Sequence, residues 1–319
     1  MMHTKLALIA GMAFLFSSCE KEIEVELPYA EPQIVVEGKL EEGDFPQVIF
    51  TRSIAYYTNI NEETLASMFV NNASASIRVG NDTIPLLKIC LADIPDSLLD
   101  EVSQQLNLPP GFDKFCIYTS LDSRLKGISG KSYELIADVE GKKLTSLTTI
   151  PQAVPLDSLW FKGDNGGDTL GYIYAQLSDP AAPGNAYRWF AQRINRYLSG
   201  ENAGEEKDLD FIAPFNSAFN DEFFNGKTFP ISYNRGSRPG SEKRDDTDFE
   251  RGYFRKGDTV VVKFTAIDDA VYQYYRSFYN SIGSSGSPFS TPANVKTNVK
   301  GGLGIWAGYG VSLDTLIIR

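Results

Sequence analysis

Histidine is almost absent from this sequence of 319 residues. Its one histidine is His3, which lies in an N-terminal segment that we expect to be removed. The expected mature chain therefore has no imidazole. This excludes Ser-His-Asp and Cys-His catalysis, histidine general bases, and zinc or iron sites built on histidine.

Cysteine is also scarce, with Cys19, Cys90 and Cys116 as its three positions. Two cysteines beyond Cys19 cannot form a structural zinc site alone. The sequence indicates no cationic or helix-terminal group that would activate either of them as a catalytic thiolate. In an exported protein the same pair is free to form a disulfide.

Basic residues are outnumbered, with 30 Lys and Arg against 41 Asp and Glu and a net charge of −11. Removal of residues 1–18 takes away Lys5 and no acidic residue, so −11 becomes about −12. An acidic surface of this kind argues against non-specific binding to nucleic acid or to anionic lipid headgroups.

A long apolar run occurs near the N-terminus, over residues 6–16, and it is too short to span a bilayer. It has the length of a signal-peptide core, and Ser17 and Ser18 then precede Cys19 in a pattern that resembles a lipobox. We predict that residues 1–18 are a lipoprotein signal peptide and that Cys19 carries the lipid anchor. Residues 19–30 would form an acidic tether. The alternative is ordinary signal cleavage that leaves a free N-terminal cysteine.

Short alternating strands with turn residues between them begin at residue 32. We predict strands over residues 34–38, 47–54, 75–79, 83–91, 132–139 and 143–149. The turn triplets 80–82 and 140–142 join two of these pairs as hairpins. Antiparallel strands at this spacing are typical of an Ig-like β-sandwich, which we place at residues 31–150.

A helical pattern interrupts these strands. Pro95 marks a helix start, and apolar residues recur on one face up to Leu106, which predicts a helical insertion between the strands that hold Cys90 and Cys116. If those strands pair antiparallel with the cysteines opposite, a disulfide can form. The alternative is two free thiols on neighbouring strands.

That register also separates the side chains of the two strands into two faces. Leu87 and Ile89 lie on the face opposite the cysteines, together with Ile117. Because this face is the more apolar, we predict that it faces the core.

Pro151 and Pro155 favour extended backbone and predict a linker at 151–157, followed by a second β-rich domain at 158–319. Its predicted strands are residues 158–162, 169–177, 186–196, 259–267, 302–310 and 313–318. Residues 198–258 are polar and glycine-rich and are predicted to be a long loop. An amphipathic helix follows Asp268, with an apolar stripe at Val271, Tyr274, Tyr275, Phe278 and Ile282. The predicted fold class is mostly β, with two antiparallel sandwich-like domains.

Aromatic and acidic groups supply the remaining candidate sites. Tyr272 and Tyr279 lie off the helical stripe and, with Trp306, are candidates for a partner or ligand surface, although core packing is the alternative. Asp164 and Asp168 are spaced like calcium ligands, but the Asn-Gly between them is also a strong hairpin signal, which we favour. No metal or cofactor is predicted.

Four segments together resemble a family of unknown function, made of outer-membrane lipoproteins commonly encoded beside TonB-dependent transporters. The segments are PQIVVEG at 32–38, GKSYEL at 130–135 continuing into TIP at 149–151, DEFFNGK at 221–227 and NVKGGLGIW at 298–306. The resemblance implies an anchored, two-domain β protein with no catalytic residues to carry over. It also implies a TonB-dependent transporter as partner.

These features favour a non-catalytic, lipid-anchored binding or accessory lipoprotein at the outer membrane that assists nutrient uptake. A surface adhesin or structural assembly subunit is the second interpretation. A glycan-processing enzyme that uses paired carboxylates is the third.

Overall fold

The computed structural model describes residues 31–54, 58, 61–95, 115–164, 169–200, 203–236, 252–284 and 294–319. The predicted signal peptide with Cys19, the tether, the helical insertion and Asp168 lie outside these residues. Residues Pro32–Arg319 form one compact unit. In the described part of the chain, no helix has the length and apolar character needed to cross a membrane.

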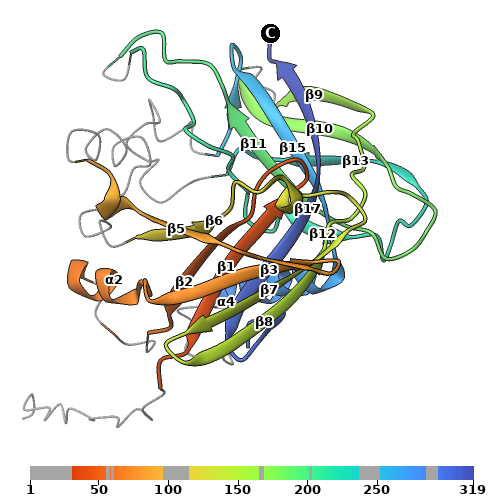
Figure 1. The fold of residues 1–319 in the computed structure, drawn as a ribbon. Coiled ribbons are helices and arrows are strands. Elements are labelled where there is room, and N and C mark those ends of the chain that lie inside the picture. The colour runs from red at the N-terminus through yellow and green to blue at the C-terminus, as the bar shows by residue number, and fades with distance from the viewer. Residues whose placement is uncertain are drawn as a thin grey trace, which may run out of the picture. The chain divides into compact units, whose positions relative to one another are not determined.

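The fold is mostly β, and the described residues form three sheets (Figure 1). The largest has eight strands in the order β12-β11-β15-β17-β1-β2-β6-β5. These are β1 (Ile34–Glu41), β2 (Gln47–Arg52), β5 (Leu87–Cys90), β6 (Cys116–Thr119), β11 (Ala186–Arg193), β12 (Ala218–Asn220), β15 (Thr259–Ile267) and β17 (Leu303–Ile317).

Two smaller sheets complete this set. A five-stranded sheet contains β16 (Val299–Lys300), β8 (Lys142–Thr149), β7 (Ser132–Val139), β3 (Ala73–Val79) and β4 (Asp82–Pro85). A four-stranded sheet contains β13 (Thr228–Tyr233), β10 (Leu170–Ser178), β14 (Phe254–Arg255) and β9 (Ser158–Gly163). The helices of the described residues are α2 (Glu62–Met68) and α4 (Asp269–Ser284), with 3-10 turns at Leu91–Asp93 and Ser123–Leu125.

The first core lies between the β1–β2 part of the large sheet and the five-stranded sheet. The alternation of side chains along β1 produces this core. Val36 and Leu40 are fully buried on one face of the strand, and Lys39 lies on the other face and points outward. Trp306 of β17 belongs to the same core. Opposite it on β1 stands Gly38, where an added Cβ would lie 2.7 Å from Cε3 of the Trp306 ring.

The second core lies between the β11–β15 part of the large sheet and the four-stranded sheet. Trp189 of β11 and Val262 of β15 face Ile173 and Ala175 of β10. Tyr187, Trp189 and Ala191 share one face of β11, and all three are buried in this core.

Strand β17 belongs to both sandwiches. Its first half, 303–309, pairs in parallel with β1, and its second half, 310–317, pairs antiparallel with β15. The parallel pair departs from the predicted antiparallel pattern. Its strands come from opposite ends of the chain, so no short hairpin dictates their direction. The predicted linker at 151–157 therefore connects two sandwiches that share a strand.

Two further strand predictions need correction. The predicted loop at 198–258 contains β12, β13 and β14, and the predicted strands at 302–310 and 313–318 are the single strand β17. Strand β13 was hidden by Pro230, which breaks a strand pattern and is tolerated here because β13 lies at the edge of its sheet.

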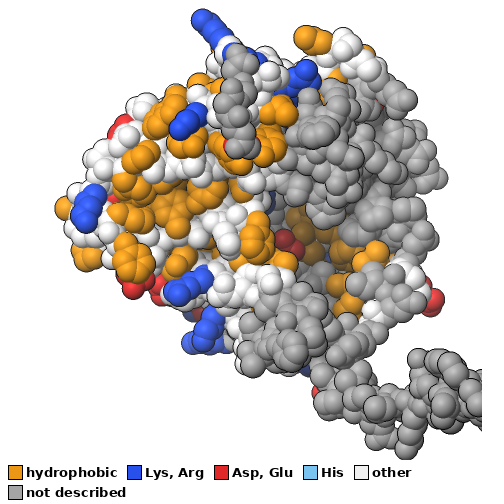
Figure 2. Space-filling view, turned by 180° about the vertical axis from the view of Figure 1, so that it is seen from behind, with side chains coloured by type: hydrophobic (Ala, Val, Ile, Leu, Met, Phe, Trp, Pro, Cys, Tyr) orange, Lys and Arg blue, Asp and Glu red, His pale blue; other side chains and the backbone are white. Residues whose placement is uncertain are grey.

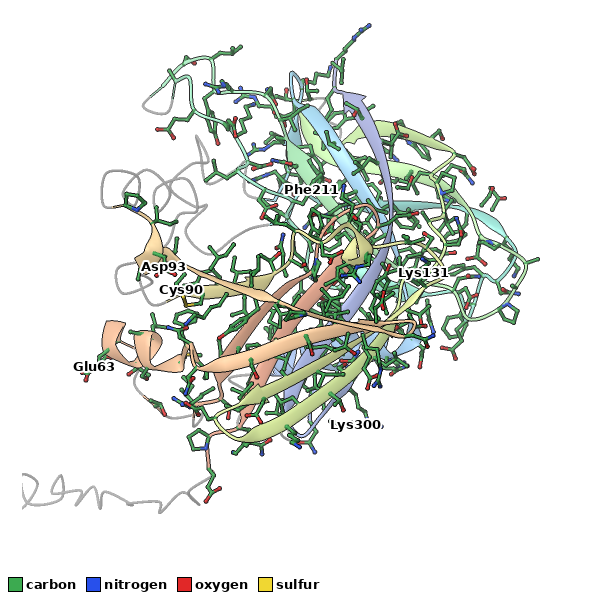
Figure 3. The ribbon with its side chains drawn as sticks, viewed as in Figure 1. Glu63, Cys90, Asp93, Lys131, Phe211 and Lys300 are labelled. Carbon is green, nitrogen blue, oxygen red and sulfur yellow. A yellow bond between two sulfur atoms is a disulfide. The ribbon has the colours of Figure 1, made fainter. Side chains whose placement is uncertain are left out.

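Strands β5 and β6 pair in the predicted register, with Cys90 opposite Cys116, and the two cysteines form a disulfide. Figure 3 shows Cys90 at the end of β5, close to Asp93. The predicted core face of these strands is wrong. Leu87 and Ile89 are 53% and 51% exposed, whereas both cysteines are buried.

The physical reason is Tyr118, which lies on the cysteine face and is 1% exposed. Its ring packs edge-on against Phe50, with centroids 5.0 Å apart. Its hydroxyl donates to the Asn71 carbonyl at 3.1 Å. At this edge of the sheet, the face with the hydrogen-bonded tyrosine and the disulfide is therefore buried, and the face with the two aliphatic side chains is exposed.

Candidate functional site: a charged aromatic pocket

The outward face of the large sheet, opposite both sandwich cores, carries helix α4. Val271 and Tyr272 of α4 pack against Ile305, Ala307 and Tyr309 of β17. The helix covers only part of this face. The uncovered part, where β1, β2, β11, β15 and β17 meet α4, forms a pocket.

The pocket has a volume of about 420 Å³, within the range of roughly 300–1,000 Å³ that is usual for small-molecule sites. Its lining combines charged side chains with aromatic and aliphatic ones. These are Glu37, Gly38, Lys39, Glu41, Gln47, Ile49, Arg188, Phe190, Asp210, Phe211, Lys263, Tyr274, Tyr275, Phe278, Ile305 and Tyr309. Figure 2 shows that the molecule is hollowed on one face, with hydrophobic and acidic side chains inside the hollow.

Lys263 of β15 supplies one buried cation of the pocket. Its Nζ lies 2.8 and 3.0 Å from the two carboxylate oxygens of Glu41. The rings of Phe211 and Phe190 lie beneath the same ammonium, with centroids at 4.4 and 5.0 Å. Lys263 is therefore a paired cation held in place by one carboxylate and two rings.

Arg188 of β11 supplies the second cation, and its surroundings differ. Its guanidinium carbon lies 3.6 Å from the Tyr275 ring centroid and 4.6 Å from that of Phe190. Its terminal nitrogens donate to the hydroxyls of Tyr309 and Tyr279, both at 3.4 Å. Its Nε is buried and has no hydrogen-bond partner among the residues that the structure describes.

The Tyr309 hydroxyl beside Arg188 stays protonated. Burial, followed by the neighbouring Tyr275, raises the pKa of Tyr309 well above its ordinary value. The hydroxyls of Tyr275 and Tyr309 lie 2.7 Å apart. Burial tends to lower the pKa of Arg188, but the three tyrosines outweigh it and the net shift is upward. The pocket thus holds a permanent positive charge beside the neutral phenol of Tyr309.

The wall that carries Phe211 is fixed by buried ion pairs just before it in sequence. Asp208 accepts from the backbone N and Nε of Arg193 at 2.8 and 3.0 Å, and from the Arg193 Nη2 at 2.9 Å. Lys207 contacts Asp258 at 2.6 Å. Phe211, labelled in Figure 3, therefore follows an anchored segment and lies beside the strands of the large sheet.

The predicted surface aromatics lie elsewhere. Tyr272 and Tyr279 are only 7% and 8% exposed and Trp306 is fully buried, so the prediction that they form a partner surface is wrong. The helix turns a face centred on Val271 and Tyr275 toward the sheet, which leaves Phe278, expected in the core, 37% exposed at the pocket. Among the described tryptophans, it is Trp160 that reaches the surface, stacked on Tyr174 with ring centroids 5.7 Å apart.

The calcium candidates gain no support as a site. Asp164 Oδ2 accepts from the hydroxyl of Tyr253 at 3.0 Å. A hydrogen bond between Tyr253 and Tyr172, and then this one to Asp164, raise the pKa of Tyr253 to about 12. Asp168 lies outside the described residues. Within the described ranges, His, Cys, Asp and Glu form no cluster of three or more that could hold a metal ion.

A second hollow of about 710 Å³ lies along the segment 149–155 and the start of α4. Its Asp268 is already used by the fold. Asp268 caps α4 through the Val271 N–H at 2.8 Å and accepts from the Thr148 hydroxyl at 3.1 Å. We therefore assign this hollow to the packing between segment 149–155 and α4, and the charged aromatic pocket is the better candidate site.

The sequence analysis did not identify the pocket residues. One signal was present, because Lys263 interrupts an otherwise apolar strand and Arg188 stands between two aromatic residues in another. A charged residue in a strand that is buried on both faces needs a partner, and this indicates a site. The partner, Glu41, lies more than 200 residues away, with a separation of 222 from Lys263.

The chain matches a protein-family model. A family model described as "Domain of unknown function (DUF4249)" covers residues 20–314. No curated protein matches the chain.

Proposed function

The chain belongs to this DUF4249 family, and we propose that it is a lipid-anchored outer-membrane binding protein that works with a TonB-dependent transporter in nutrient uptake. In this proposal it binds its ligand without chemical change. Cys19 anchors it and residues 19–30 tether the folded body.

The observation that carries the binding role is the pocket of about 420 Å³ between α4 and the large sheet. Its charged groups are held by rigid strands, and its walls are aromatic. A small number of fixed polar groups in an apolar cavity is the usual composition of a ligand site. The Lys263–Glu41 pair and the Arg188–tyrosine cluster order the pocket before any ligand arrives.

The membrane and partner roles are supported by sequence. The segment 15–19 resembles a lipobox, and the family resemblance implies a neighbouring transporter. The acidic charge of −11 leaves lipid, not a basic patch, as the means of attachment.

The experiment compares wild-type protein with Cys19→Ala, and uses Cys90→Ala as a matched control that removes a different cysteine. Wild-type and Cys90→Ala proteins should partition into detergent and gain the mass of a lipid. Cys19→Ala should be soluble or uncleaved. Partition of signal-free Cys19→Ala into detergent would refute the anchor.

The partner is tested by mild-detergent extraction of outer membranes, purification through a C-terminal tag and mass spectrometry of what co-elutes. A TonB-dependent transporter should be enriched with wild-type protein. Its absence, with adhesin or filament subunits in its place, would refute the transport role and favour a structural assembly.

A further inference from the structure

Arg188 is a cation of the pocket that has no carboxylate partner in the part of the chain that the structure describes. The other two basic residues, Lys263 and Lys39, contact the same acid, Glu41, at 2.8 and 3.8 Å. Among the described residues Arg188 forms no ion pair, and its buried Nε has no hydrogen-bond partner. A buried guanidinium is ordinarily paired, because removing its charge and donors from water is costly.

The contacts that Arg188 does make leave most of its binding capacity unused. A guanidinium offers five N–H donors in one plane. Two phenol oxygens accept from it at 3.4 Å, near the long limit for a hydrogen bond. The rings of Tyr275 and Phe190 stabilise the charge but take up none of the in-plane donors.

We propose that this pocket binds a small ligand that carries one carboxylate on a flat apolar body, and that Arg188 receives the carboxylate. The proposal rests on the binding role proposed above and specifies its ligand. A planar carboxylate matches the guanidinium fork and accepts two parallel hydrogen bonds. The ligand then supplies the counter-charge that the described residues do not.

The other charges of the pocket limit the ligand to a single negative charge. Its three basic groups, Lys39, Arg188 and Lys263, face three acidic ones, Glu37, Glu41 and Asp210. A dianion such as a phosphate monoester would be repelled by these acids. The body of the ligand would lie against Phe278, Ile49 and Ile305.

The test uses 3-phenylpropionate and its neutral counterpart 3-phenylpropionamide, measured by ligand-observed NMR titration of the full-length protein. The carboxylate should bind roughly tenfold or more tightly than the amide, as expected for hydrogen bonds between charged groups. Arg188→Met should abolish that preference and Arg188→Lys should retain part of it. Arg196→Met, at an exposed arginine that pairs with Glu206, is the matched control and should behave as wild type. Equal binding of acid and amide by the wild type would overturn the proposal.

Two further measurements keep the result interpretable. Unliganded Arg188→Met should melt close to the wild-type temperature, because the change breaks no ion pair among the described residues and removes only two long hydrogen bonds and two ring contacts. A large fall would show that Arg188 is a structural group satisfied by its tyrosines, and would overturn the proposal. Decanoate distinguishes an aromatic acid from a fatty acid as the ligand. If decanoate binds more tightly than 3-phenylpropionate, the carboxylate on Arg188 stands, but the flat body of the ligand is refuted.

These outcomes are independent of the transporter experiment. Carboxylate binding without a co-purified transporter would refute the transport role alone. A co-purified transporter without carboxylate binding would refute the ligand assignment alone.

Discussion

Gly38 and Trp306 come from opposite ends of the chain, and their contact predicts a measurable energetic coupling. They are partners in the parallel β1–β17 pair. Trp306 is fully buried, and its Nε1 donates to the Tyr133 carbonyl at 3.0 Å. A Cβ on residue 38 would lie 2.7 Å from Cε3 and 3.3 Å from Cζ3 of the tryptophan ring, inside van der Waals contact.

Gly38→Ala should therefore overpack the first core and destabilise the protein by roughly 1–3 kcal/mol. Trp306→Phe removes the ring atoms that meet the new Cβ, but it also removes the hydrogen bond to Tyr133. On its own this should cost roughly 1–3 kcal/mol. In the double variant the clash disappears, so its loss should be smaller than the sum of the single losses by roughly 0.5–3 kcal/mol.

The assay is guanidinium denaturation followed by far-UV circular dichroism, which does not depend on tryptophan emission. Gly283→Ala is the matched control. An added Cβ there meets nothing closer than 3.8 Å, and alanine favours a helix, so its stability should be unchanged or slightly higher. Strict additivity of Gly38→Ala and Trp306→Phe would show that the two residues do not touch and would refute the β1–β17 pairing.

Two further predictions concern local interactions. Non-reducing mass spectrometry should find the protein about two mass units lighter than its reduced form. The double variant Cys90→Ser with Cys116→Ser should lower the free energy of unfolding by about 3 kcal/mol, because the disulfide closes a loop that spans 26 residues. Quantitative alkylation of both thiols without reductant would contradict the disulfide. The Arg124 guanidinium and backbone N–H hold the pKa of Asp122 at about 2, below the ordinary 3.8. Because the folded-state pKa is lowered, the stabilisation is present above the unfolded-state pKa and is lost as pH falls through about 2. Arg124→Gln should move the Asp122 carboxyl titration, followed by NMR, back toward 3.8, and an unmoved titration would contradict this pairing.

Local signals in the sequence predicted the strands and hairpins well. The turns at 80–82 and 140–142 join β3 to β4 and β7 to β8. Gly80 and Gly141 adopt φ of +59° and +81° there, which suits glycine. The register of Cys90 with Cys116 was also predictable, because alternation in two short strands allows few pairings.

Non-local choices were not predictable in the same way. Which face of a strand is buried depends on what the rest of the fold places against it, so counting aliphatic residues assigned Ile89 to the core when Tyr118 belonged there. The helix α4 shows the same limit. A stripe drawn by periodicity predicted Tyr272 at the surface, yet a sheet is broad enough to bury residues on either side of the stripe.

The pocket arises because successive side chains of a strand point to opposite faces of the sheet. The segments that resemble the family build the core face, and the pocket residues lie on the other face. The segments 32–38, 130–135 and 298–306 meet at Trp306. Gly38 makes room for its ring, Tyr133 accepts its N–H, and Asn298 bonds its backbone N and O at 3.0 and 2.8 Å. These segments thus hold β1 beside β17.

The residue of β17 just before Trp306 faces the other way, so Ile305 lines the pocket while Trp306 fills the core. Glu41 reaches the pocket from the end of β1, and Arg188 and Lys263 reach it from β11 and β15, outside all four segments. Substitutions at these three outward positions can therefore change what is bound without disturbing Trp306. In our proposal the family segments hold the framework, and the side chains on its outward face would determine the ligand.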